Sequence, residues 1–369
     1  MSFGTTNVMT DLTAIAKAFS LHGCYLAGAP YGNGHINDTY AVTYEEHGRR
    51  IRYILQRIND RVFRNVPALM ENIQRVTTHL ARGDATAGRR TLTIVPTREG
   101  AAYHRDSVGG YWRCYVFIEN AQTYEILQDP RQAREAARAF GEFQCLLVNL
   151  GGPRLHDTIP HFHDTRHRFD ALQRAVAADR HGRAAAAETE IAFALAREAM
   201  VDVLLNLQAR GEIPERITHN DTKLNNVMLD DTTGQGVCVI DFDTVMPGLV
   251  LYDFGDMVRS AANSAAEDET DLSRVRMQLP VFAVLVEGYL ASAGPLLNET
   301  ERAYLAFAAR LITFEIGLRF LTDFLEGDTY FKIHRSVHNL DRCRCQFALV
   351  RSMETQAAEM NAVVEKLTS

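Results

Sequence analysis

The chain has 369 residues, of which 46% are hydrophobic and 23% charged, and its formal net charge is −7 at pH 7. These values are typical of a globular protein that can hold two domains, and the acidic balance does not indicate nucleic acid as a partner. No stretch reaches the ~20 apolar residues of a membrane span, and the N-terminus lacks the basic and apolar regions of a secretory signal. We therefore expect a cytoplasmic protein without a membrane or nucleic-acid partner.

The cysteines and histidines give no metal-binding pattern. None of the six cysteines forms a CxxC pair, and Cys343 with Cys345 alone offers too few ligands for zinc. His161, His163 and His167 form a second cluster, but no further ligand group follows at the spacing of a metal site. The sequence therefore predicts free thiols, and histidines that are solvated or locally hydrogen-bonded.

The first 118 residues are dominated by strand signals. They predict strands at 24–29, 38–44, 52–57, 92–96 and 111–118. A short amphipathic helix is expected within 7–20, and a longer one over 67–82, where Leu69, Ile73, Val76 and Leu80 recur at helical spacing. This part of the chain is thus predicted to be a β-rich lobe with one main helix.

Beyond residue 118 the pattern becomes helical. Helices are expected over 131–150, over 170–209 and over everything beyond about 252, and a hairpin is expected over 227–243. The predicted fold class is therefore α+β with two lobes, a β-rich N-lobe over 1–118 and a mostly helical C-lobe over 119–369.

The segment 218–226, with sequence THNDTKLNN, contains the residues that phosphoryl transfer needs. Such a reaction requires a carboxylate to orient and deprotonate the attacking hydroxyl, and oxygen ligands for Mg²⁺. Asp221 is the candidate catalytic base, and Asn226, five positions later, is a candidate metal ligand. Asp241, at the far end of the predicted hairpin, is the second candidate ligand. The ordered set predicts a kinase more specifically than scattered turn residues would.

Other polar residues near this segment have candidate supporting roles. Lys223, two positions after the base, could offset the charge that develops on the transferred phosphate, so we count it as catalytic. His219 is expected to hold the loop by hydrogen bonding. Asp253 and Asp256 are expected to be supports, with Asp253 accepting backbone N–H groups of the catalytic loop.

A glycine-containing turn near the N-terminus is the candidate phosphate-binding loop. Gly32 and Gly34 lie between two predicted strands, where backbone N–H groups could approach the phosphates of ATP. The turn is also compatible with an ordinary hairpin, and no Walker A motif follows it. Where protein kinases carry a strand lysine, this chain has Gln56, which can bind a phosphate but has no charge.

The segment Val116–Glu119 fits a hinge between the lobes. Phe117, Ile118 and Glu119 would then pair with adenine through their backbone. The alternative is an inner strand that simply continues to this point. The sequence at this stage predicts an ATP-dependent kinase of a small-molecule acceptor.

Five stretches across the chain resemble the N-acetylhexosamine 1-kinases of the aminoglycoside-phosphotransferase superfamily: 30–37 (PYGNGHIN), 53–56 (YILQ), 161–165 (HFHDT), 218–226 (THNDTKLNN) and 319–331 (RFLTDFLEGDTYF). The resemblance extends from about residue 12 to about residue 365 and includes Gln56 in place of the lysine. It implies a two-lobed protein-kinase-like fold. It also implies phosphorylation by ATP and Mg²⁺ of the anomeric hydroxyl of N-acetylglucosamine or N-acetylgalactosamine, giving the α-1-phosphate.

The apolar stretch 309–326 contains the candidate acceptor site. It predicts a buried helix, yet Glu315, Arg319 and Asp323 fall on one stripe of it at i, i+4 and i+8. One interpretation is an internal ladder of ion pairs. The other, which the resemblance favours, is that Arg319 and Asp323 bind sugar hydroxyls or the acetamido group. Tyr330 and His35 would complete that site, in which Asp221 also contacts the substrate.

Two alternatives to a hexosamine kinase remain at the level of sequence. The first is the same chemistry on another acceptor, such as an aminoglycoside, choline, homoserine or a different sugar. Arg319 argues against cationic acceptors because a buried arginine repels them. The second is a nucleotide-binding module without catalysis, which the complete set of Asp221, Asn226 and Asp241 disfavours. The oligomeric state is not predicted.

Overall fold

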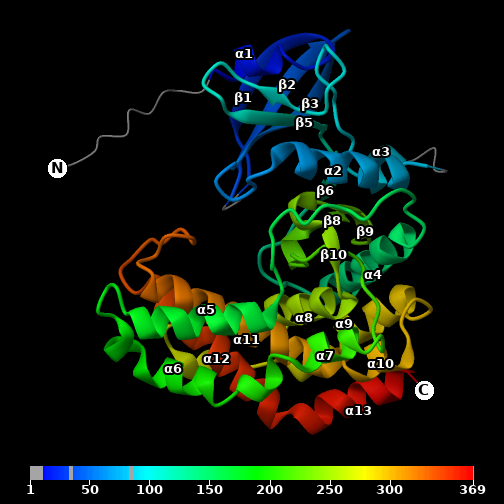
Figure 1. Cartoon of the computed structure of the whole chain (residues 1–369). Coiled ribbons are helices and arrows are strands. Elements are labelled where there is room, and N and C mark those ends of the chain that lie inside the picture. Colours follow the sequence, from blue (N-terminus) through cyan, green and yellow to red (C-terminus); the bar gives the residue numbers. More distant parts are fainter. Residues whose placement is uncertain (1–10, 33–35, 83–86, 369) are drawn as a thin grey trace. The chain divides into compact units, whose positions relative to one another are not determined.

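The computed structural model describes residues 11–32, 36–82 and 87–368, and the chain falls into two compact units (Figure 1). The first unit, Met1–Glu119, is called the N-lobe below, and the second, Asn120–Ser369, the C-lobe. The assignment of nucleotide binding to the first and of catalysis to the second remains a prediction.

The N-lobe is built on a five-stranded antiparallel sheet in the order β1-β2-β3-β5-β4. Its strands are β1 (Cys24–Pro30), β2 (Asp38–Glu46), β3 (Arg49–Ile58), β4 (His104–Arg105) and β5 (Tyr111–Val116). Its helices are α1 (Leu12–Ala16), α2 (Val66–Leu80) and α3 (Ala87–Arg90). The predicted helix over 67–82 is confirmed as α2, whereas the described part of the one within 7–20 is only the short α1.

A two-residue turn fixes the register of β2 and β3. His47 and Gly48 both have positive φ, 51° and 75°, and Glu46 pairs with Arg49. This is the backbone of a type I′ hairpin, whose twist matches that of the strands. The hairpin lets β3 begin three residues earlier than the predicted strand.

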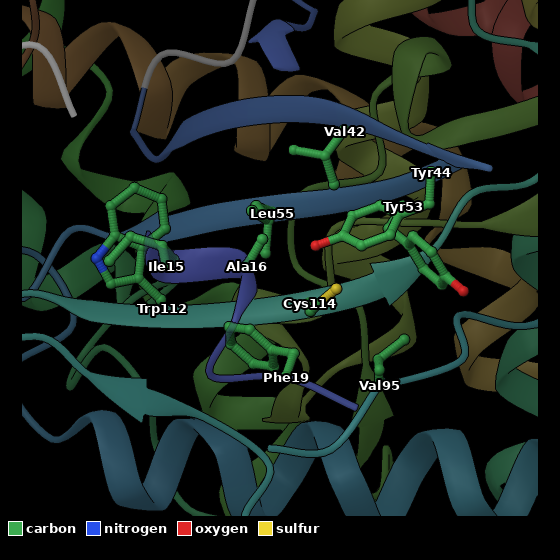
Figure 2. Packing of buried hydrophobic residues seen from close by; sticks show 10 residues of the cluster. All are labelled: Ile15, Ala16, Phe19, Val42, Tyr44, Tyr53, Leu55, Val95, Trp112 and Cys114. Atoms are coloured by element: carbon green, nitrogen blue, oxygen red, sulfur yellow. The ribbon is translucent and has the colours of Figure 1, made fainter. Parts of the chain in front are cut away.

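Alternate residues of β2, β3 and β5 build the core of the N-lobe on one face of the sheet. Figure 2 shows these side chains packed with three that precede β1 and with Val95: Ile15, Ala16, Phe19, Val42, Tyr44, Tyr53, Leu55, Val95, Trp112 and Cys114. Because side chains alternate along a strand, Gln56 and Arg113, which are direct cross-strand partners, lie on the opposite face.

The predicted strand over 92–96 is not a regular strand. The chain there is extended beside β5, with Val95 N donating to Cys114 O at 2.8 Å, but only Ile94 forms a β-bridge. Pro96 follows directly and has no N–H to continue the ladder, which explains why the pairing stops.

The C-lobe is mostly helical, with two small antiparallel sheets in the orders β6-β8-β9 and β10-β7. Its strands are β6 (Ala121–Gln122), β7 (Arg216–Thr218), β8 (Val227–Asp230), β9 (Gly236–Val239) and β10 (Met246–Gly248). Its α-helices are α4 (Pro130–Leu147), α5 (Thr165–Ala178), α6 (Glu188–Leu195), α7 (Val203–Ala209), α8 (Val250–Ala261), α9 (Leu279–Ala293), α10 (Glu299–Ala303), α11 (Leu305–Leu325), α12 (His338–Thr355) and α13 (Ala357–Thr368). Short 3₁₀ turns are η1 (Ala184–Ala187), η2 (Glu198–Met200), η3 (Leu224–Asn226), η4 (Phe242–Thr244) and η5 (Leu272–Arg274).

The predicted hairpin is confirmed as β8–β9, and the predicted helix over 131–150 as α4. A capping box of Asp129 and Gln132 begins α4, and Pro130 stands at its first position. The predicted helix over 170–209 is wrong as one element. After α5 the chain turns through Asp179 (φ 31°) and Gly182 (φ 62°), and the Asp179 carboxylate accepts from the N–H groups that follow, so alanine-rich propensity is overridden locally.

The α11 helix is confirmed as a buried helix, packed against α5, α8 and α12. It is buried over nearly its whole length, which explains why its sequence has almost no polar face. Over residues 11–32, 36–82 and 87–368, none of the helices has the length and apolar character to cross a membrane.

Candidate active site

The predicted catalytic loop, residues 219–223, lies between β7 and η3, and the first turn of α8 fixes its backbone. Asp253 is fully buried, and its carboxylate accepts from His219 N at 2.9 Å, Asn220 N at 2.7 Å and Gln144 Nε2 at 2.7 Å. Asn220 has a positive φ of 64°, a backbone form that these two N–H bonds help to hold. The predicted role of Asp253 as the acceptor for loop N–H groups is confirmed.

His219 supports the same loop from the side of the hairpin. Its Nε2 lies 2.8 Å from Ile240 O, and its Nδ1 accepts from Asp221 N at 3.3 Å. Since one partner is an acceptor and the other a donor, the ring fits the neutral tautomer with the proton on Nε2. The ring packs edge-on against Phe140 and Phe143, so the expected propping role of His219 is confirmed.

Asp221, Lys223 and Asn226 form one hydrogen-bonded group. Lys223 Nζ lies 2.7 Å from Asp221 Oδ1, and Asn226 Nδ2 donates to Asp221 Oδ2 at 3.1 Å and to Asp221 O at 2.8 Å. Desolvation opposes ionisation of the Asp221 carboxyl, but the Lys223 charge outweighs it and lowers its pKa. Asp221 is therefore a carboxylate at neutral pH, held in place from both sides.

Asp241 follows β9 after one residue, Ile240. Ile240 N donates to Asn226 O at 2.9 Å, so the backbone itself joins the segments that carry the two predicted metal ligands. Asp241 is exposed and left-handed, with φ 63° and ψ 66°, which is an uncommon conformation for a residue other than glycine. The β8–β9 hairpin thus brings Asn226, which precedes β8, and Asp241, which follows β9, to the same end of the hairpin.

A buried ion pair links α11 to the catalytic loop. Glu315 accepts from His163 Nδ1 at 2.8 Å and from Thr165 Oγ1 at 3.1 Å, and His163 Nε2 lies 3.1 Å from Asn220 O. Both ring nitrogens thus face acceptors, so the ring donates from both, as an imidazolium does. Desolvation raises and the His163 charge lowers the pKa of Glu315, and the net shift is downward. Glu315 therefore pairs with His163, and the predicted ladder with Arg319 is not formed.

Arg319, one turn further along α11, is half-buried among aromatic rings. Its guanidinium carbon lies 4.8 Å from the ring centre of Phe162, 5.8 Å from that of Tyr330 and 5.6 Å from that of Phe331. Within the described part of the chain it forms no hydrogen bond or ion pair to a protein group. A guanidinium with five donors is thus left for another partner.

A second arginine stands beside this cluster. Arg168 Nη2 donates to Phe162 O at 3.0 Å, and its Nε donates to the same oxygen at 3.2 Å. Burial, followed by the neighbouring charge of Arg319, lowers the pKa of Arg168 to about 10. Arg168 was not predicted, because an arginine in a histidine-rich stretch that also holds Arg166 gives no pattern of its own.

Asp323 has a different role from the predicted substrate contact. Its Oδ1 accepts from Thr329 N and Tyr330 N, both at 2.8 Å, and its Oδ2 accepts from Phe331 N at 3.0 Å and Asn339 Nδ2 at 2.9 Å. The chain after α11 needs acceptors for these N–H groups, and the buried carboxylate supplies them. Asp323 thus holds the loop that carries Tyr330, which is 47% exposed. Both carboxylate oxygens of Asp323 are used in these hydrogen bonds.

Comparison with a protein-family model also indicates phosphoryl transfer. Residues 28–289 match the model of the Phosphotransferase enzyme family, which is more than half of the chain. The chain belongs to this phosphotransferase family. Three solved structures with the same fold are a choline kinase from Cryptosporidium parvum Iowa II (11% identity, TM-score 0.60, 93% of each chain covered), a microcompartment-associated aminopropanol kinase (16%, 0.59, 95% of this chain and 98% of that one) and a spectinomycin phosphotransferase in complex with ADP and spectinomycin (11%, 0.52, 93% and 94%).

These matches confirm the predicted two-lobed, kinase-like α+β fold. The family match makes the chain a phosphotransferase, and structures of this fold include one that holds ADP. The identities are too low to carry a substrate from those proteins to this one.

The donor set of this phosphotransferase fits a magnesium ion that is shared with a nucleotide. Asn226 directs its amide nitrogen to Asp221, which leaves Oδ1 as the acceptor, and Asp241 adds an exposed carboxylate. Over the described ranges, no three His, Cys, Asp or Glu side chains cluster as a closed metal site. Mg²⁺ commonly takes one or two protein oxygens and completes its shell with phosphates and water, so two ligands are sufficient.

The predicted nucleotide-binding residues lie in the N-lobe. Gly32 is exposed with φ 73°, and a Cβ added there would meet no atom within 4 Å, so the backbone is open to approach. Gly34 and His35 lie outside the described residues. Gln56 accepts from Arg113 Nε at 2.9 Å and donates to Thr39 Oγ1 at 3.0 Å. The buried Arg113, which the sequence analysis missed, thus puts a positive charge beside Gln56.

The predicted hinge residues show a mixed environment. Ile118 is buried, whereas the Phe117 ring lies 3.7 Å below the Arg52 guanidinium and meets Tyr31 edge-on. Arg52 Nε also donates to the Glu119 carboxylate at 2.9 Å. The side chain of Glu119 is therefore used within the N-lobe, and pairing of this segment with adenine would involve its backbone.

Proposed function

We propose that the protein is a kinase that uses ATP and Mg²⁺ to phosphorylate the anomeric hydroxyl of N-acetylhexosamines, giving the α-1-phosphate. The observation that carries the kinase chemistry is the group of Asp221, Lys223 and Asn226, held by hydrogen bonds on a loop that α8 fixes. Phosphoryl transfer depends mainly on such positioning and on charge stabilisation.

Each residue of the group has a distinct task in this proposal. Asp221 orients the sugar hydroxyl and takes its proton as the new O–P bond forms and the bond to the ADP oxygen breaks. Lys223 stabilises the negative charge on the phosphate oxygens. Asn226 and Asp241 would hold the magnesium ion, which supplies further positive charge to the phosphates when it is bound.

The acceptor class is supported by the environment of Arg319. The guanidinium of Arg319 has N–H donors without a protein acceptor, and the charge of Arg168 lies close to it. The surroundings of these two arginines therefore attract acceptor oxygens and repel an ammonium group. N-Acetylhexosamines offer an amide carbonyl and several hydroxyls and have no charge. Choline and aminopropanol, the substrates in the names of two neighbours in fold, are cations and fit these surroundings poorly. The resemblance of residues 319–331 to N-acetylhexosamine 1-kinases supports the same choice.

An acceptor panel tests the proposal. ADP release would be measured with ATP and Mg²⁺ on N-acetylglucosamine, N-acetylgalactosamine, glucose, galactose, kanamycin and choline, with release in the absence of acceptor as the background. Phosphorus NMR would locate the phosphate on any product. Turnover of the N-acetylhexosamines with phosphate on the anomeric oxygen is expected. Turnover of choline or kanamycin alone would overturn the sugar assignment, and no turnover on any acceptor would favour a non-catalytic nucleotide-binding protein.

A further inference from the structure

A second carboxylate of α8, Asp256, lies beside the catalytic loop. It follows Asp253 by three residues, so both side chains project from the same face of the helix. That face follows the loop, since Asp253 binds the N–H groups of His219 and Asn220, and Thr222 Oγ1 donates to Asp253 O at 2.5 Å. The helix also packs against η3, which begins directly after Lys223. Asp256 is therefore placed next to the part of the loop that carries Lys223.

Half of the Asp256 carboxylate has no hydrogen-bond donor. Its Oδ1 accepts from Arg259 Nε at 2.7 Å, whereas its Oδ2 is buried without a partner among the residues that the structure describes. The residue is only 2% exposed, so water does not readily compensate. A buried carboxylate oxygen without a donor is unfavourable and is rare in folded proteins. Such an oxygen at an active site is expected to gain a donor at some stage of the reaction.

Lys223, which directly precedes η3, is a donor on the part of the loop that packs against α8. Its ammonium carries three N–H bonds, and Asp221 Oδ1 is its one ion-pair partner in the described chain. Although desolvation and the Arg259 charge disfavour the charged form, the Asp221, Asp256 and Glu267 carboxylates raise the pKa of Lys223 to about 12. The Lys223 side chain keeps 40% of its surface exposed, so it has room to move.

We propose that Asp256 is a positioning residue that holds the Lys223 ammonium when Lys223 leaves Asp221. This inference rests on the proposed phosphotransfer. While Lys223 is bound to Asp221, the ammonium competes with the acceptor hydroxyl for the same carboxylate oxygen. Moving to Asp256 frees Asp221 to take the hydroxyl proton and keeps the ammonium at the phosphate. No covalent bond changes in this step.

Arg259 keeps Asp256 ready for this role. It is 5% exposed and lies between two carboxylates, with Nε on Asp256 and Nη1 at 2.9 Å from Glu267 Oε1. The arginine holds Oδ1 and so keeps Oδ2 from turning toward a different donor. Glu267, the other partner of Arg259, provides a matched comparison, because its carboxylate belongs to the same network and its side chain is 41% exposed.

A double-mutant cycle tests the link between Asp256 and Lys223. Asp256→Asn keeps the shape and an acceptor for Arg259, and is expected to lower kcat about tenfold with both KM values changed by less than about twofold. In a Lys223→Met background the same change should cost less than about twofold, because the residue acts through Lys223. Additive losses, or a raised acceptor KM at unchanged kcat, would overturn the proposal. Glu267→Gln should leave kcat near the wild-type value.

A chemical measurement gives a second readout that needs no turnover. The chain has four lysines, so Lys17, Lys332 and Lys366 serve as internal references when Lys223 is acylated and followed by mass spectrometry. Loss of the Asp256 charge should make Lys223 react several-fold faster, and Glu267→Gln, which removes a more exposed charge that also raises the pKa of Lys223, should increase the rate less. An unchanged rate would overturn the proposal even if no acceptor is phosphorylated, so it fails separately from the proposed function. If Asp256→Asn does not fold, Asp256→Glu and Asp256→Gln replace it, and only the charged variant should retain slow labelling.

Discussion

Two glutamates in opposite lobes each pair with a cation, but in very different surroundings. Glu315 of α11 is fully buried and accepts from both His163 and Thr165. Glu119, at the end of the N-lobe, is about half exposed and pairs with Arg52 alone. Buried charges must be saturated by hydrogen bonds, whereas exposed pairs gain little over water. The C-lobe thus holds its site through buried polar networks, and the contrast predicts where substitutions will matter.

The largest effect of a substitution on activity is expected at Asp221 in the C-lobe. Asp221→Asn keeps the shape of the side chain and removes the base, so kcat should fall roughly 10³-fold, within the range that a positioned general base contributes. Single-turnover kinetics would measure the loss, and ATP binding, followed by calorimetry, should remain close to that of the wild type. A variant that retains more than about a tenth of kcat would show that another group takes the proton.

The buried glutamate itself gives the next largest effect. Glu315→Gln replaces a charged acceptor facing His163 with a neutral amide and should lower the free energy of unfolding by about 2–3 kcal/mol at pH 7. The folded pKa of Glu315 is lowered, so its stabilisation is present above the unfolded value of about 4.3 and is lost as the pH falls through the folded pKa.

Urea unfolding at pH 7 and at pH 4 would check the sign. The difference between wild type and Glu315→Gln should shrink at the lower pH. A difference that stays constant would mean that the ionisation of Glu315 does not contribute to stability.

Arg319 differs from the saturated residues of this network, because it is half-buried and forms no hydrogen bond or ion pair within the described part of the chain. Arg319→Met keeps the contact with Phe162 but removes the donors, so the KM for the acceptor should rise about 10- to 100-fold, the value of one or two hydrogen bonds to a charged group. The KM for ATP and the melting temperature should change little, since no ion pair is broken. Arg335→Met, an exposed arginine in an ion pair with Asp268, is the matched control. A large loss of stability in Arg319→Met would instead indicate a structural arginine.

The sequence predicts the role of a residue well when its partners are close in the chain, and poorly when they are distant in sequence. Asp221, Lys223 and Asn226 lie within six residues, so their spacing alone determines that they meet. The partner of Glu315 is 152 residues away in sequence, and the pairing of Gln56 with Arg113 depends on the register of two strands. No local pattern contains such information. The hydrogen bonds of Asp323 have the same origin, because the demand for acceptors comes from the N–H groups of a loop whose path the sequence does not specify.

The smallest effect is expected at the exposed glutamate of the N-lobe. The Arg52–Glu119 pair is 40% and 50% exposed, and such pairs typically contribute less than ~1 kcal/mol. Glu119→Gln should therefore change the free energy of unfolding by less than about 0.5 kcal/mol, measured by urea titration. The KM for ATP should also stay within about twofold, because a hinge would pair with adenine through its backbone, which the substitution leaves intact. A much larger rise in that KM would mean that the Glu119 carboxylate itself contacts the nucleotide, and the contrast between the two glutamates would then be one of function as well as burial.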